Sequence, residues 1–120
     1  PLNFVYKDGK IYFHCAKNGH KLDAIKQNKK VSFCVIEKDE VDSEKLTTLF
    51  RSVVVFGKAE IMENEEKINS AMLSFGLKYN NDINVVKKEI ERERSGLCCV
   101  EITIEHITGK QAIEFLRKNM

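Results

Sequence analysis

The residues best suited to chemistry form one short basic turn, Lys17-Asn18-Gly19-His20-Lys21, between a strand-like and a helix-like segment. The first turn of a helix presents unpaired backbone N–H groups and a partial positive charge, so it usually carries Asp or Glu. A bound phosphate reverses this preference, because it accepts hydrogen bonds from the N–H groups and from cationic side chains. The turn is therefore a candidate anion site, and a solvated lysine-rich turn is the alternative interpretation.

Composition limits what the rest of the chain can be. Its 120 residues suit a single domain, and the 42% of hydrophobic residues is ordinary for a globular protein. A net charge of +2 leaves no basic footprint for nucleic acid. No apolar stretch approaches the roughly 20 residues of a membrane span. We therefore expect a cytoplasmic domain of residues 1–120 that binds neither nucleic acid nor a membrane.

The cysteines do not indicate a metal or a disulfide framework. They are Cys15, Cys34, Cys98 and Cys99, all in strand-like runs. None has C-x-x-C spacing, and an adjacent pair is a poor start to a disulfide framework. We expect reduced, mostly buried thiols. Ligand-spacing rules disfavour a metal site built from His14, Cys15 and His20, so no metal is expected.

The first half of the chain predicts a hairpin, a short helix and two strands. Asp8-Gly9 supplies the positive φ angles of a tight hairpin turn. Leu22 and Ile25 mark the inner face of a helix over about 19–28. A strand over 31–36, an exposed acidic loop over 37–45 and a long strand over about 50–62 follow. Gly57 inside that strand predicts a bulge or a close backbone approach.

The second half predicts two helices, a strand and a terminal helix. Apolar spacing and N-caps place the helices behind Asn64 and Asp82, ending near Gly76 and Gly96. Alternation over 100–105 predicts a half-buried strand. The terminal helix would follow Gly109 with its inner face made by Ala112, Ile113 and Leu116. Consecutive strands joined by short turns favour an antiparallel sheet, and closure into a small barrel would remove its edges.

Four segments, in this order and spacing, resemble the pyridoxamine 5′-phosphate oxidase-like split-barrel flavoproteins, and within them most closely the nitroimidazole-resistance family. They are Pro1-Leu2-Asn3-Phe4, Tyr12-Phe13-His14-Cys15-Ala16, Gly19-His20-Lys21 and Arg51-Ser52-Val53-Val54-Val55-Phe56-Gly57-Lys58-Ala59-Glu60. The resemblance extends to Ile107-Thr108-Gly109-Lys110. It implies a mainly β fold with α, a split barrel of about six antiparallel strands with peripheral helices. The family's N-terminal helix and first strand would precede Pro1 and are expected to be absent.

The resemblance also implies which residues bind FMN at the interface of a homodimer. His14 and Cys15, followed by Ala16, match a strand-end pair beside the flavin and its phosphate, where the second residue is usually Ser or Thr. His20 and Lys21 match a basic pair that holds the phosphate, and the first of them is often Arg. A thiol donates weakly and a histidine is charged only at lower pH, so Lys21 should contribute most. The implied ring contacts are Leu2, Asn3, Phe4 and Ser52, and the neighbours of Ser52, Arg51 and Val53, are further candidate cofactor-binding residues.

The function that the resemblance implies is an FMN-dependent oxidoreductase that passes electrons to a small electrophile such as a nitroaromatic. A G-x-G-x-x-G fingerprint is absent, so any NAD(P)H donor would dock transiently. His14 is the candidate catalytic residue, as a proton donor, or else a packed histidine. A non-catalytic flavin- or small-ligand-binding sensor or carrier is the alternative function. Haem or a deazaflavin, bound by some split-barrel relatives, is an alternative ligand.

Several other residues have two interpretations each. Arg51 either contacts an anion of the cofactor or substrate, or pairs with an acid such as Glu60. His106 is expected on an outer face without a role. The charged helices over 65–94 predict a solvated face with intrahelical pairs that can also border a substrate pocket. Aromatic residues expected in the core, and not stacked on flavin, are Tyr6, Tyr12, Phe13 and Phe56.

Overall fold

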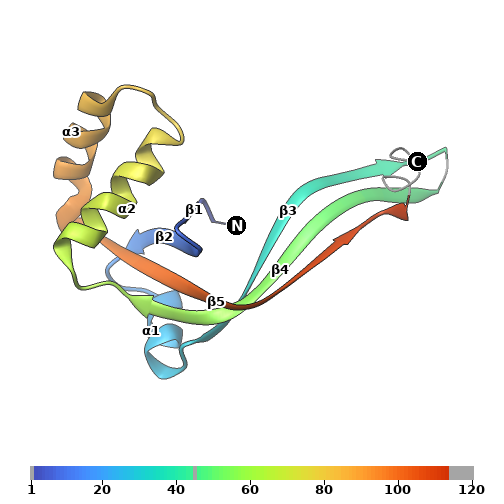
Figure 1. The fold of residues 1–120 in the computed structure, drawn as a ribbon, viewed down its shortest axis with the longest axis horizontal. Helices are drawn as coiled ribbons and strands as arrows, with labels where there is room; N and C mark the ends of the chain where they lie inside the picture. The colour runs from blue at the N-terminus through green and yellow to red at the C-terminus, as the bar shows by residue number, and fades with distance from the viewer. Residues whose placement is uncertain (1, 45, 114–120) are drawn as a thin grey trace.

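The computed structural model describes residues 2–44 and 46–113 as one antiparallel sheet with three α-helices (Figure 1). In chain order the elements are β1 (Val5–Lys7), β2 (Lys10–Ala16), α1 (His20–Gln27), β3 (Lys30–Asp42), β4 (Thr47–Ile61), α2 (Glu65–Leu77), α3 (Ile83–Glu93), the 3-10 turn η1 (Arg94–Gly96) and β5 (Leu97–Gln111). The mainly β, antiparallel class with peripheral helices is thus confirmed. None of the described helices is long and apolar enough to cross a membrane.

The sheet is open in the part of the chain that the structure describes. Its five strands follow the order β1-β2-β5-β4-β3, where about six strands and a closed barrel were expected. β1 and β3 lie at the two edges. The open form follows from the lengths of the strands, because β2 pairs with β5 only as far as Thr103, whereas β5 continues to Gln111 beside β4.

Local sequence signals account for the turns and helix ends. Asp8 and Gly9 have φ angles of 52° and 79°, and Lys7 pairs with Lys10 across this tight turn. Asn64 caps α2 by accepting a hydrogen bond from the Lys67 N–H at 3.0 Å. Asp82 caps α3 in the same way through the Asn84 N–H, also at 3.0 Å. Both predicted N-caps and the predicted hairpin are therefore confirmed.

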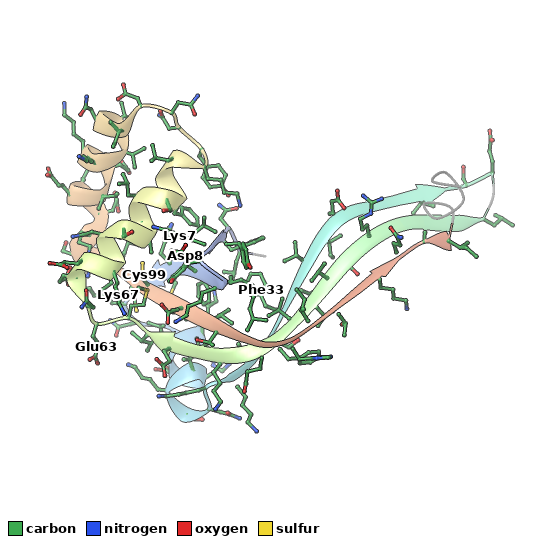
Figure 2. The ribbon with its side chains drawn as sticks, viewed as in Figure 1. Lys7, Asp8, Phe33, Glu63, Lys67 and Cys99 are labelled. Atoms are coloured by element: carbon green, nitrogen blue, oxygen red, sulfur yellow. The ribbon has the colours of Figure 1, made fainter. Side chains whose placement is uncertain are left out.

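The main hydrophobic core lies where α1 covers one face of β2, β4 and β5. Leu22 and Ile25 of α1 are buried, as their spacing predicted. The buried members of this core are Ile11, Phe13, Leu22, Ile25, Val55, Ala59, Val100 and Ile102. A second cluster joins Ile68 and Met72 of α2 to Cys99 of β5, which lies beside that helix (Figure 2). Helices therefore cover both faces of the sheet at its β2 end.

Away from these helices the sheet extends as a three-stranded projection, which we call the arm (Figure 1). The arm comprises residues 36–42 of β3, 47–54 of β4 and 105–111 of β5. The radius of gyration is 17.4 Å, compared with about 14 Å for a compact chain of this length. The helices and the rest of the sheet, which we call the body, contain both hydrophobic clusters.

One prediction about the arm was wrong. Residues 37–45 were expected to form a loop, but β3 continues to Asp42, past a register shift between Ile36 and Lys38. The helix expected after Gly109 begins later than predicted, because β5 continues to Gln111; Ile113 is helical, and the residues after it lie outside the described ones. Pairing with β4 extends both strands although their sequences lack apolar alternation. Leu116 of the expected terminal helix lies outside the described residues, and Ala112 is buried.

Gly57 lies where body and arm meet. The β4–β5 register shifts between Phe56 and Gly57, as expected of a bulge. A Cβ atom at Gly57 would collide with the backbone carbonyl of Thr103. The predicted bulge and the predicted close approach are both confirmed.

Candidate functional site

The predicted basic turn leads directly into α1. Gly19 precedes the helix with φ 155° and ψ 166°, a conformation that is essentially restricted to glycine. No side chain of the described residues caps this helix, whose first turn carries His20 and Lys21. The backbone N–H groups at this end therefore lack the partner that Asn64 and Asp82 supply to the other two helices. This end of α1 is able to accept an anion.

Lys21 and Cys15 lie on the α1 side of β2. Lys21 Nζ is 5.9 Å from the centroid of the Phe13 ring, and Cys15 packs against the main core. Burial raises the pKa of the Cys15 thiol, and the nearby Cys98 adds to this, whereas the positive charge of Lys21 acts in the opposite direction. The structure thus brings Cys15 and Lys21 together at the start of α1.

His14 lies on the opposite face of β2, because successive strand residues point to opposite faces. Its ring packs edge-on against Phe75 of α2, with centroids 4.5 Å apart. Burial lowers the pKa of His14, so the imidazole is neutral at neutral pH. His14 is therefore separated from Cys15 and from Lys21 of α1 by the backbone of β2.

A largely apolar cavity of about 420 Å³ adjoins His14. Residues of α2 and α3 form most of its wall, and Leu97 of β5 completes it. The lining includes Met72, Phe75, Tyr79, Val85, Val86 and Ile90. His14, Asn80 and the Tyr79 hydroxyl are its uncharged polar groups, and Glu89 and Glu93 line it as well. The expectation that these helices border a pocket is consistent with this arrangement.

A smaller cavity of about 280 Å³ lies on the α1 side and is basic. Lys17, Lys26 and Arg94 line it together with Cys98. Arg94 donates to the Leu97 carbonyl at 3.1 Å and to Glu65 at 2.7 Å, while its buried Nε has no partner among the described residues. No pattern in the sequence indicated Arg94, which follows a run of solvated charges. Its neighbour Arg92 pairs within α3 with Glu89, as predicted for that face.

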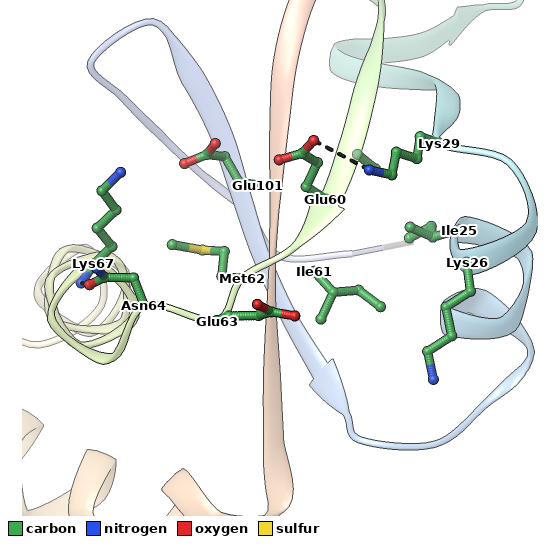
Figure 3. Close-up of a pocket in the computed structure, with 11 residues that line it drawn as sticks. Ile25, Lys26, Lys29, Glu60, Ile61, Met62, Glu63, Asn64, Lys67 and Glu101 are labelled. Atoms are coloured by element: carbon green, nitrogen blue, oxygen red, sulfur yellow. Dashed lines mark hydrogen bonds and ion pairs between the residues drawn. The ribbon is translucent and has the colours of Figure 1, made fainter.

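A third, more polar groove of about 540 Å³ runs between α1 and α2 (Figure 3). Lys26 and Lys29 line it on one side, and Lys67 lies on the other. Glu60 pairs with Lys29 at 3.6 Å, and Glu63 and Glu101 add further acidic groups. Because both signs of charge alternate along this groove, it is less suited to a phosphate than the start of α1.

The N-terminal segment lies beside β3. The Phe4 ring packs edge-on against Phe33, with centroids 5.3 Å apart, and Lys78 Nζ donates to the Phe4 carbonyl at 2.7 Å. Leu2 and Phe4 line a hollow of about 450 Å³ with residues 32–36 of β3. Ser52 is the β4 partner of Ile36, so it lies one strand away from this hollow. Sequence reasoning missed Lys78, which a pattern within one element could not reveal.

The remaining predicted site residues are Arg51 and Val53 in the arm, Asn3 near the N-terminus and Ala16 at the end of β2. Arg51 pairs with Glu37 at 3.1 Å and donates to Gln111 at 3.2 Å. Its acidic partner is thus Glu37, while the suggested Glu60 pairs with Lys29. Asn3 and Ala16 are exposed, and Val53 is half-buried against the main core. His106 is exposed beside Phe56, as expected for a residue on an outer face.

The aromatic residues divide between core and surface. Phe13 is buried, as predicted. Tyr12 is half-buried and donates to Glu101 at 3.1 Å; burial and this carboxylate raise its pKa to about 12. The expectation of a core position was wrong for Tyr6 and Phe56, which are 63% and 46% exposed. Tyr6 lies on the edge strand, and Phe56 points away from the face that holds Val55.

Comparison with known proteins gives a family and a fold. The family model described as pyridoxamine 5′-phosphate oxidase matches residues 1–111. A comparison with curated proteins found no match. A candidate 5-nitroimidazole antibiotic resistance protein from Bacteroides thetaiotaomicron is similar in structure, with TM-score 0.67 and 20% identity over 91% of this chain and 65% of that one.

Two further solved structures share the fold. One is a conserved hypothetical protein from Mycobacterium tuberculosis, with TM-score 0.74 and 20% identity over 90% of this chain and 64% of that one. The other is an FAD-binding protein from Mesorhizobium loti, with TM-score 0.57 and 23% identity over 91% of this chain and 70% of that one. The chain spans less than two thirds of the Bacteroides and Mycobacterium proteins. Because the family model covers most of its length, this chain belongs to the pyridoxamine 5′-phosphate oxidase family.

Proposed function

We propose that this protein is a cytoplasmic, homodimeric flavoprotein that binds FMN and passes electrons to a small electrophile such as a nitroaromatic. The observation that carries the proposal is the uncapped, basic start of α1, where Gly19, His20 and Lys21 converge. A family whose similar structures include an FAD-binding protein supports a flavin as the ligand. Four free thiols among the described residues suit a reducing compartment.

The residues at the start of α1 fit a phosphate group. Lys21 would supply a full positive charge, and the first-turn N–H groups would donate hydrogen bonds. His20 would add a charge only when protonated, and the Cys15 thiol would be a weak donor. The φ of Gly19 leaves this approach free of a side chain. Lys21 therefore carries most of the proposed binding energy for the phosphate.

The flavin ring would lie against the N-terminal segment and the neighbouring strands. Lys78 holds the Phe4 carbonyl and lies 4.6 Å from the Phe4 ring centroid, which fixes this segment beside β3. Leu2, Asn3 and Phe4 would offer the ring backbone groups, and Ser52 a hydroxyl. FMN, when bound, supplies a ring that accepts and releases electrons. The protein's part is to bind and orient it.

A homodimer is part of this proposal because the arm exposes apolar side chains. Ile36 and Ile107 are 62% and 56% exposed. A second copy of the chain would cover them and complete the surroundings of the flavin ring. The electron donor would be NADH or NADPH docking transiently, since the chain has no nucleotide-binding fingerprint.

His14 and the cavity between α2 and α3 are the proposed place of the electrophile. The neutral imidazole offers one N–H toward a largely apolar space. The packing of His14 against Phe75 equally favours a second candidate function, a flavin-binding sensor or carrier without turnover. A panel of nitroaromatics assayed with NADH and NADPH separates the two. Turnover that His14→Gln abolishes, with FMN still bound, supports the reductase; stoichiometric FMN without turnover supports the carrier.

The primary experiment is an FMN titration followed by visible absorbance and by the melting temperature. We expect Lys21→Ala to weaken FMN binding by about 1–3 kcal/mol, the scale of a hydrogen bond to a charged group, and His20→Ala by less. Lys87→Ala on the exposed surface of α3 is the matched control. A colourless protein that neither gains flavin absorbance nor shifts its melting temperature contradicts the proposal. A spectrum of haem or of a deazaflavin would instead replace FMN as the ligand.

A further inference from the structure

Two cysteines face each other across neighbouring strands at the start of the proposed phosphate site. Cys15 of β2 is the direct antiparallel partner of Cys98 of β5. Directly opposed residues of an antiparallel pair point to the same face of the sheet. The packing agrees, because Cys15 and Cys98 both contact the main core under α1. Cys99 points to the other face and packs with α2.

The Cα separation expected from their register lies within the range that a disulfide spans. The Cys99 carbonyl accepts a hydrogen bond from Met62 N–H at 2.9 Å, on the β4 side of β5. Since backbone groups of successive strand residues point to opposite edges, Cys98 directs its own groups toward β2 and Cys15. Opposed residues of this hydrogen-bonded kind have Cα atoms about 5.5 Å apart. Disulfides most often have a Cα separation of about 5.5–6 Å.

Both thiols are reachable from solvent. Cys15 and Cys98 are half-buried, and Cys98 lines the small basic cavity with Lys17, Lys26 and Arg94. Lys17 and Lys26 at this opening favour a reagent that carries carboxylates, while Arg94 is paired with Glu65. Cys98 lines this cavity and Cys15 does not, so Cys98 is the thiol that a reagent meets first.

We propose that Cys15 and Cys98 are a thiol–disulfide exchange site for small anionic disulfides. The Cys98 thiolate attacks one sulfur of the disulfide RSSR, which forms a mixed disulfide and releases RS⁻. The Cys15 thiolate then attacks the Cys98 sulfur and releases the second RS⁻. The two protein thiols lose two electrons and two protons, and RSSR leaves as two RSH. Reduced small thiols reverse both steps.

The exchange also changes the affinity for FMN, and this consequence rests on the proposed function. Oxidation removes the Cys15 S–H as a donor at the phosphate end of FMN. Losing one neutral hydrogen bond corresponds to binding that is about two- to tenfold weaker. The oxidised protein therefore binds FMN less tightly than the reduced protein.

The test uses the full chain equilibrated in buffers of reduced and oxidised glutathione, then acid-quenched, alkylated and analysed by peptide mass spectrometry. The starting protein carries Cys34→Ser and Cys99→Ala, which leave only the proposed pair. We expect a reversible Cys15–Cys98 cross-link as the buffer becomes more oxidising. Cys15→Ser in this protein should stop at glutathione on Cys98. Circular dichroism of each variant checks that it is folded.

Alkylation of both thiols in every buffer, in a folded protein, would overturn the exchange site. So would a cross-link of wild-type protein that forms through Cys99 and leaves Cys15 alkylated. The FMN arm is separate: it compares FMN affinity of the reduced and the cross-linked protein. Equal affinities would overturn the coupling to FMN, whereas a reduced protein that binds no FMN would overturn the proposed function and not the exchange.

Discussion

β5 passes through both regions of the molecule and behaves differently in each. In the body it is a central strand between β2 and β4, and Val100 and Ile102 are 0% and 1% exposed. Beyond Thr103, where pairing with β2 ends, it becomes an edge strand of the arm. Ile107 there is 56% exposed, although it pairs with the buried Val55. Burial along one strand thus depends on its neighbours, and in the described part of the chain no helix covers the arm as helices cover the body.

This difference indicates what each region contributes. The body has helices on both faces of the sheet and positions the start of α1. The arm has one layer and free strand edges, features that proteins usually cover or pair. Its exposed apolar residues are the ones that the proposed homodimer would bury. The comparison therefore predicts stability effects in the body and association effects in the arm.

The largest expected effect separates two isoleucines of β5. Ile102→Ala should lower the free energy of unfolding by about 2–5 kcal/mol, because it leaves a cavity in a fully packed core. Ile107→Ala should cost the monomer less than about 1 kcal/mol, since its side chain is already exposed. Denaturant unfolding at low protein concentration measures both. Equal losses would mean that the arm is covered even in the monomer.

A smaller effect is expected at the junction between the two regions. Gly57→Ala places a Cβ atom against the Thr103 carbonyl, and backbone on both sides leaves little room to yield. We expect a loss of about 1–3 kcal/mol, typical of overpacking. Gly96→Ala is the matched control, because a Cβ there meets nothing within 4 Å. A Gly57→Ala protein as stable as the control would show that the β4–β5 bulge is adjustable.

The same contrast explains which parts of the fold could be predicted from the sequence. The inner face of α1, the caps Asn64 and Asp82 and the bulge at Gly57 each depend on local patterns, and all were confirmed. The arm could not be predicted, because residues 37–45 and 105–111 show no apolar alternation. Pairing with β4 extends β3 and β5 through these segments.

Prediction of the candidate site was partial for a related reason. The strand–turn–helix that presents Lys21 follows from the order of residues along the chain. The separation of His14 from Cys15 follows from strand alternation in β2, which places adjacent residues on opposite faces of the sheet. Arg94 and Lys78 reach the site from other elements, at the end of α3 and of α2. Contacts of that kind depend on packing between distant segments, and no spacing along the chain encodes them.

Association is the property that should change in the arm. Ile107→Glu would place an unpaired charge in the proposed dimer interface and raise the dimer dissociation constant by about tenfold or more. The folded monomer should keep its stability. Thr103→Glu is the control, since it adds the same charge to an exposed position of β5 in the body. Light scattering over a concentration series measures the change. Equal dissociation constants for both variants would exclude this face of the arm from the interface.

The smallest expected effect is a pH dependence of the free energy of unfolding that arises from His14 in the body. Burial against Phe75 lowers the pKa of His14 below its usual value, so the folded protein binds this proton less readily than the unfolded chain. As pH falls below about 6.5, the unfolded chain is protonated first and the free energy of unfolding decreases. The decrease ends once pH passes the lower pKa of the folded state. Above about pH 7.5 the contribution of His14 is constant.

The measurement is the slope of unfolding free energy between pH 7.5 and pH 5.5, taken from denaturant titrations. These pH values are chosen at about one unit on either side of the usual histidine pKa. His14→Gln should lose less stability over this interval than the wild-type protein. If His14→Gln and the wild-type protein have the same slope, the imidazole is as well solvated in the folded state as in the unfolded chain, and the cavity beside it is open to water.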